Sequence, residues 1–96
     1  MLSVDEATAA ITLQTTHTYG RLLVAEAAGR AAGAGVEAAR RDLAGAEHRR
    51  DAGMATDADV LSLVVHLADL QQRAIQASGD AAIARAELNR LMMEGP

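Results

Sequence analysis

Apolar and small residues recur along the second half of the chain at alternating intervals of three and four residues. This series consists of Val60, Leu63, Leu67, Leu70, Ala74, Ala77, Ala81, Ala84, Leu88 and Leu91. A matching series of mostly small residues runs through the first half: Leu22, Ala25, Gly29, Ala32, Val36, Ala39, Leu43 and Ala46. Because a spacing that averages 3.5 residues is typical of coiled coils, the pattern predicts two long helices packed along one seam.

The ends of both helices carry local signals. Ser3 followed by Glu6 predicts a capping box that starts the first helix near Val4. Gly53 can adopt the left-handed conformation that ends a helix, and Thr56 is a good N-cap for the next one. We therefore expect helices at about 4–51 and about 57–93, joined by a tip at about 52–56. So short a link makes the helices antiparallel.

Folding the chain about residue 54 predicts which residues lie at the same height. Pairs whose numbers add to about 109 or 110 should face each other, for example Ala39 with Leu70 and Gly29 with Ala81. Large residues then mostly face small ones. Residues 1–96 are thus predicted to form a single all-α domain, a long antiparallel two-helix coiled-coil hairpin with closely spaced axes.

A second set of apolar residues lies off this seam. It comprises Leu61, Val64, Val65, Ala68, Ile75, Ala82 and Ile83 in the second helix, and Leu23, Ala27, Ala31, Ala34 and Ala38 in the first. Two helices cannot bury both sets, so the hairpin should expose an apolar surface that associates with other copies or other helices. In isolation we expect a dimer or a higher helical bundle.

Composition excludes several functional classes. The formal net charge of -4 and the absence of a basic stripe argue against nucleic acid as a partner. The chain has no cysteine, so disulfides and thiolate chemistry are excluded. The most apolar run, VLSLVVHLADL, is interrupted by His66 and Asp69 and is shorter than the roughly 20 residues that span a bilayer. We therefore expect no membrane-spanning helix.

Three aspartates and two histidines are the candidates for metal binding. Helix capping and solvation explain Asp51, Asp57 and Asp59 without a ligand, because the sequence lacks the ligand spacing of a calcium loop. His48 and His66 lie near each other in the expected register, yet no third zinc ligand accompanies them. No metal site is predicted.

Catalytic and cofactor-binding residues are also not expected. Ser62 and Ser78 lack a histidine and an acid in a matching arrangement, and no glycine-rich loop follows a strand. The Gly29-x-x-x-Gly33 spacing favours close helix packing in water over a membrane dimer, since Glu26 and Arg30 lie beside it. The chain is predicted not to be an enzyme.

The centre of the chain carries a composite motif. The pattern A-x-x-R-x-x-x-G over residues 46–53, followed by A-T-x-x-D-V-L over residues 55–61, resembles the hairpin tip of the TolC-like outer membrane efflux protein family. The downstream stretch LADLQQRAIQASGDAAIARAELNRLM is similar to the returning helix of that family. The resemblance extends from about Tyr19 to Met92 and rests on the order and spacing of these motifs around one turn.

The resemblance implies a structural role in transport. In that family, three protomers each contribute two such hairpins to a periplasmic α-barrel, which a β-barrel continues in the outer membrane. The hairpin tips meet a periplasmic adaptor protein. By this likeness the chain is the periplasmic portion of an outer membrane efflux channel, a homotrimer in full-length members. The residues that match the family's adaptor-docking and entrance-packing region are Arg49, Gly53, Met54, Ala55, Thr56, Asp59 and Val60.

The sequence also departs from the family pattern. The family's β-strands, second hairpin repeat and signal peptide are missing, so we expect a fragment or a truncated reading frame. Met93 stands where the family usually has glycine at the end of the returning helix. The alternative interpretation is a free-standing helical hairpin that dimerises into a four-helix bundle and acts as a small cytosolic protein-protein interaction module. A third is a ligand- or metal-binding bundle enzyme.

Overall fold

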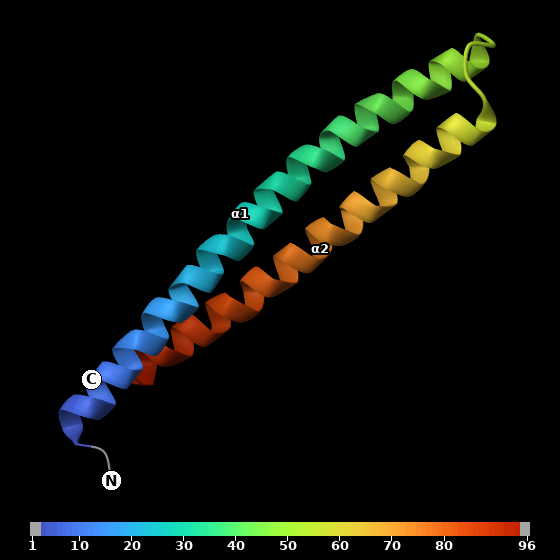
Figure 1. Ribbon diagram of the computed structural model, residues 1–96. Helices are drawn as coiled ribbons and strands as arrows, with labels where there is room; N and C mark the ends of the chain where they lie inside the picture. The colour runs from blue at the N-terminus through green and yellow to red at the C-terminus, as the bar shows by residue number, and fades with distance from the viewer. Residues whose placement is uncertain (1–2, 95–96) are drawn as a thin grey trace.

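The computed structural model describes residues 3–94, which form two long helices in a hairpin (Figure 1). Helix α1 spans Val4–Asp51 and helix α2 spans Asp57–Glu94. The helices are antiparallel and contact each other along their length, and the molecule measures 74 × 17 × 14 Å. The predicted all-α antiparallel hairpin is therefore confirmed, and both helices end within one residue of the expected positions.

The predicted capping box starts α1. The Ser3 side-chain oxygen accepts a hydrogen bond from the Glu6 backbone N–H at 3.2 Å, and the Glu6 carboxylate accepts one from the Ser3 N–H at 3.4 Å. Asp5 adds a second carboxylate to this turn, where the helix dipole is positive. These contacts satisfy backbone donors that have no partner within the helix.

The predicted seam is the interface between the helices. Every residue of the two spaced series is buried or half-buried. Thr18, 2 % exposed, extends the α1 series by one more step, which the apolar pattern alone does not reveal. The most closely packed cluster consists of Leu22, Ala25, Ala81 and Ala84, with Leu88 against it. Small side chains on both helices allow this close approach.

The expected register is confirmed in the core cluster, where Ala25 packs with Ala84 and Leu22 with Leu88, whereas two glycine contacts lie about one turn away from it. A Cβ placed on Gly29 would lie 3.9 Å from the Ala77 Cβ, and one on Gly35 would lie 3.5 Å from Leu70. Gly29 therefore packs nearest Ala77 and not the predicted Ala81. Side chains of an antiparallel coiled coil interleave along the seam. A small residue can therefore contact a partner residue that lies about one turn away from its own height.

Two ion pairs join the helices on opposite sides of the seam. Arg21 lies 2.9 Å from Glu87, and Glu26 lies 3.3 Å from Arg85. Glu26 thus binds Arg85 across the hairpin. Such exposed pairs contribute only about 0–1 kcal/mol each, so they support the register more than they stabilise the fold.

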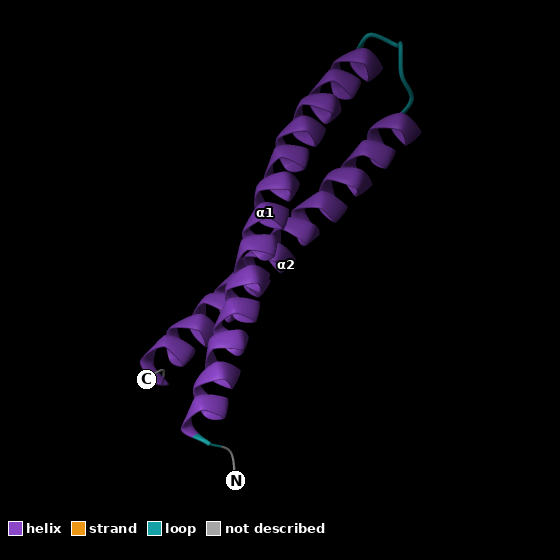
Figure 2. Cartoon of the chain, turned by 60° about the vertical axis from the view of Figure 1, so that its left-hand side comes forward, coloured by secondary structure: helices purple, strands orange, loops and turns teal. Residues whose placement is uncertain are grey.

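The two helices wind around each other. They run side by side in Figure 1 and cross at a shallow angle after the molecule is turned in Figure 2. This geometry is expected for helices with a 3.5-residue apolar repeat. Within residues 3–94, neither helix holds a stretch sufficiently long and apolar to span a bilayer.

Candidate functional site

The tip begins where Gly53 ends α1. Gly53 has a φ of 77°, the left-handed conformation that other residues adopt at a cost. Its N–H donates to the Arg50 carbonyl at 2.9 Å, and the Met54 N–H donates to the Arg49 carbonyl at 2.7 Å. This pair of bonds is a Schellman motif, which satisfies carbonyls that the helix end leaves free.

A second reciprocal cap begins α2. The Asp59 N–H donates to the Thr56 hydroxyl at 3.1 Å, and the Thr56 N–H donates to the Asp59 carboxylate at 2.9 Å. The hydrogen bonds from the Thr56 backbone and side chain, together with the Arg49 charge, hold the pKa of Asp59 below its ordinary value. The sequence placed both residues at this helix start, and the T-x-x-D spacing is the signal for their mutual bond.

Arg50 links the two helix ends. Its guanidinium lies 3.4 Å from the Asp51 carboxylate and 3.8 Å from that of Asp57. The three aspartates singled out as a possible cation site are therefore used in ion pairs and a cap. Within the described residues, no group of three or more histidine or acidic side chains is placed to hold a metal ion.

The residues predicted to dock an adaptor all lie at or next to the tip, but they differ in what they expose. Gly53, Thr56 and Asp59 shape the turn through the bonds described above. Val60 is only 7 % exposed and packs in the seam, so it contributes to packing. Met54 is 76 % exposed and is the large apolar side chain that the turn presents to solvent, beside the half-buried Ala55. Arg49 adds an exposed positive charge.

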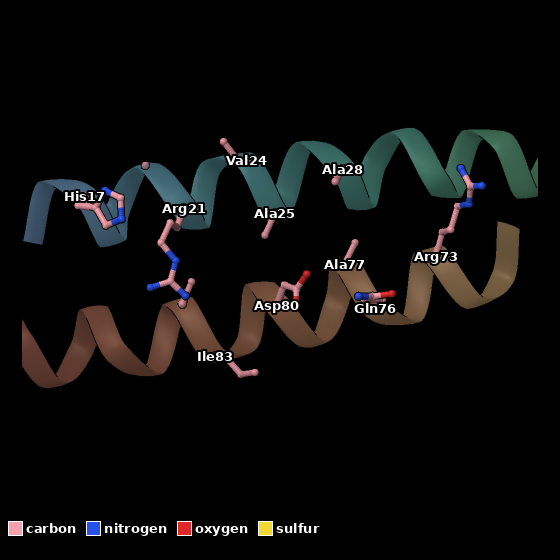
Figure 3. A pocket seen from close by; sticks show the side chains of 12 residues that line it. His17, Arg21, Val24, Ala25, Ala28, Arg73, Gln76, Ala77, Asp80 and Ile83 are labelled. Atoms are coloured by element: carbon pink, nitrogen blue, oxygen red, sulfur yellow. The ribbon is translucent and has the colours of Figure 1, made fainter. Parts of the chain in front are cut away.

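An open groove of about 830 Å³ follows one side of the seam near its middle (Figure 3). Its floor is formed by alanines, with Ala25 and Ala77 pointing toward each other from the two helices. Arg21 and Arg73 stand on its rim, and each is already paired with a carboxylate, Glu87 and Asp69 respectively. The groove offers helix-packing surface and no assembled catalytic group.

Each helix also carries an apolar stripe on its outer side. The α1 outer stripe consists of Leu23, Ala27, Ala31, Ala34 and Ala38. The α2 outer stripe consists of the apolar or small residues Leu61, Val65, Ala68, Ile75, Gly79 and Ala82, with the polar Gln72 at its centre. Val64, predicted for the same surface, is exposed but lies off this line. All of these residues are exposed except Ala38, which is half-buried, so the predicted second apolar surface is present. Ile83, assigned to the same surface from the sequence, lies instead on the groove.

In comparisons with known proteins, no protein-family model, no curated protein and no solved structure matches the chain.

Proposed function

We propose that the chain is a hairpin of an outer membrane efflux channel wall, with its tip directed toward a periplasmic adaptor protein. The observation that carries this proposal is the pair of apolar outer stripes. A wall of side-by-side hairpins requires each one to offer packing surface on both outer sides, and this hairpin does so. The TolC-like resemblance of the tip motif assigns the wall to this class of channel.

The two stripes suit each other when neighbouring hairpins point their tips in the same direction. The α2 outer stripe carries the larger side chains Leu61, Val65 and Ile75, whereas the α1 outer stripe is mostly alanine. In such a wall the α2 helix of one copy runs antiparallel to α1 of the next. Large residues then pack on small ones, as they do along the seam inside each hairpin.

The tip supports docking because its shape is fixed before a partner arrives. Two caps and the Arg50 ion pairs hold the turn. Met54 projects from this rigid support, and the flexible, polarizable thioether of methionine adapts to the surface of a partner protein. A preorganised tip lowers the entropy that binding costs.

A binding measurement tests the docking role. The probe is the purified helical hairpin domain of a periplasmic adaptor protein, titrated by calorimetry. We expect Met54→Asp to weaken binding at least tenfold, because it places a charge where an apolar contact is needed. The matched control is Met93→Asp, which changes an even more exposed methionine at the opposite end and should leave the affinity unchanged. Equal affinity for both variants, or for a chain with Gly53 and Asp59 both replaced, would overturn docking at the tip.

A free-standing interaction module is the second candidate, and the exposed α2 outer stripe favours it because one partner helix is enough to cover that stripe. Inspection of the flanking DNA separates the two. A signal peptide and β-strand segments in the same reading frame support the channel; an isolated frame supports the module.

A further inference from the structure

The α2 outer stripe has a symmetry of its own that the channel proposal does not use. Its residues recur every four and three positions from Leu61 to Ala82, so they form one continuous line along the helix. The three large members, Leu61, Val65 and Ile75, are between 61 % and 65 % exposed. The remaining members are alanine, glycine or glutamine. The order of large and small residues along this line decides which helix it fits.

A two-fold axis beside Gln72 places large residues opposite small ones. In an antiparallel pair of α2 helices related by this axis, Leu61 meets the partner's Ala82. Val65 then meets the partner's Gly79, and Ile75 meets the partner's Ala68. Gly79 suits this role because, apart from the adjoining backbone of α2, nothing in its own hairpin lies within 4 Å of where its Cβ would be. The space beside it is therefore free to receive a valine side chain.

The polar and charged residues beside the stripe are compatible with the same two-fold axis. Gln72 lies on the axis, where two side-chain amides can donate and accept hydrogen bonds with each other. Along one flank of the stripe, Arg85 comes to the height of the partner's Asp57, and the axis repeats this pair of opposite charges. On the other flank, Asp69 comes to the height of the partner's Gln76. No like charges face each other among these positions.

The exposed area of the hairpin is sufficient for such an interface. The chain exposes 6789 Å², against about 5,200 Å² for a compact protein of its 10.0 kDa mass. The excess of about 1,600 Å² exceeds the roughly 800 Å² that each partner contributes to a standard interface. Covering one such face therefore removes about half of the excess exposed area.

We propose that the isolated hairpin forms a two-fold symmetric dimer through its α2 outer stripe, with the two tips pointing in opposite directions. The occupant of the stripe is α2 of a second copy. This arrangement differs from the side-by-side wall, in which the same stripe covers α1 of a neighbour and the tips lie at one end. The dimer does not depend on the channel proposal, since it follows from the stripe alone.

Cysteine cross-linking tests the axis directly, because the chain has no cysteine of its own. Gln72→Cys places two thiols across the axis, within reach of a disulfide, which needs Cβ atoms about 3.5–4.5 Å apart. We expect rapid cross-linking of this variant under mild oxidant. The matched control is Gln76→Cys, which lies beside the groove on the flank of the stripe; in the dimer its two copies are about 10 Å apart along the helix axes, so it should cross-link much more slowly. Equal cross-linking rates for the two variants would overturn the proposal. A wall-like array would give this result, because it keeps the thiols of the Gln72→Cys variant apart.

Sedimentation equilibrium supplies an independent measurement. Ile75→Glu introduces a charge at two places in the dimer and is expected to weaken self-association roughly a hundredfold. Ile83→Glu changes a comparably exposed isoleucine outside the stripe and should leave the dimer intact. Both positions face solvent within one hairpin, so circular dichroism should show that both variants keep their helices. Dimers of equal strength in the two variants would contradict the assignment.

Discussion

At the residue scale, Gly53 has a role that no other glycine of the helices shares. Its positive φ is required for the chain to leave α1, and the backbone bonds of Gly53 and Met54 to Arg50 and Arg49 depend on it. Gly33, in contrast, lies inside α1 with open space around the position of a Cβ. Glycine is costly in the helix interior and favourable at the turn.

Alanine substitution should therefore have opposite effects at the two sites. We expect Gly53→Ala to lower the free energy of unfolding by about 1–2 kcal/mol, because alanine resists the left-handed conformation. Gly33→Ala should raise it by about 1 kcal/mol through improved helix propensity. Urea denaturation followed by circular dichroism measures both. A Gly53→Ala variant that is as stable as the parent would show that the turn does not need this conformation.

The cap at Asp59 makes a second residue-scale prediction. Because hydrogen bonds from Thr56 lower the pKa of Asp59 in the folded state, the carboxylate contributes stability above its ordinary pKa of 3.8. That contribution to the free energy of unfolding is lost as the pH falls through the lowered pKa of Asp59 in the folded state. Carboxyl NMR titration should find a midpoint below 3.8, and Thr56→Ala should raise it part of the way by removing the hydroxyl donor. A midpoint at or above 3.8 in the parent chain would contradict the cap.

At the element scale, the seam is controlled by small side chains. Ala84 is only 1 % exposed and belongs to the cluster of Leu22, Ala25 and Ala81. We expect Ala84→Leu to lower the free energy of unfolding by roughly 1–3 kcal/mol, because the added volume forces the helices apart. Ala44→Leu, on the exposed side of α1, should change it by less than about 0.5 kcal/mol. Thermal unfolding of the two variants compares them, and equal stability would show that the seam is loosely packed.

The same seam explains what could be predicted from the sequence. Both helices and their ends follow from local signals, the 3.5-residue repeat and the caps at Ser3 and Thr56. The contacts of single glycines were predicted less well, since alanine and glycine fit against many neighbours, and Gly29 packs nearest Ala77 instead of Ala81. The pairing of Glu26 with Arg85 was not predicted, because it joins two helices that are far apart in the sequence.

The candidate site, too, could be predicted only in part. The position of the tip and its capping residues could be predicted because they depend on a few neighbouring residues. Val60 was predicted both for the seam and for the docking set, and its burial confirms the seam prediction. The position of Ile83 on the groove could not be predicted from the sequence, because it depends on how the two helices twist around each other.

At the scale of the whole molecule, a thin rod of two helices exposes much more surface than a compact protein of equal mass. Its function is therefore expected to lie in its contacts with other helices. The wall and the two-fold dimer are two ways to cover the α2 outer stripe. Both require that the chain first doubles back at the tip, because the seam residues are then covered within the chain and the outer stripes are left as exposed apolar surface.

The distance between Arg30 and Ser78 tests this central requirement most directly. Both residues line the side of the hairpin opposite the large groove, one on each helix. Spin labels on Arg30→Cys and Ser78→Cys, measured by pulsed electron resonance in chains diluted with unlabelled protein, should lie about 10–20 Å apart, the helix separation of about 8–10 Å extended by the label arms. A single unbroken helix would place the same labels roughly 70 Å apart, and that result would contradict the hairpin and both proposals that depend on it.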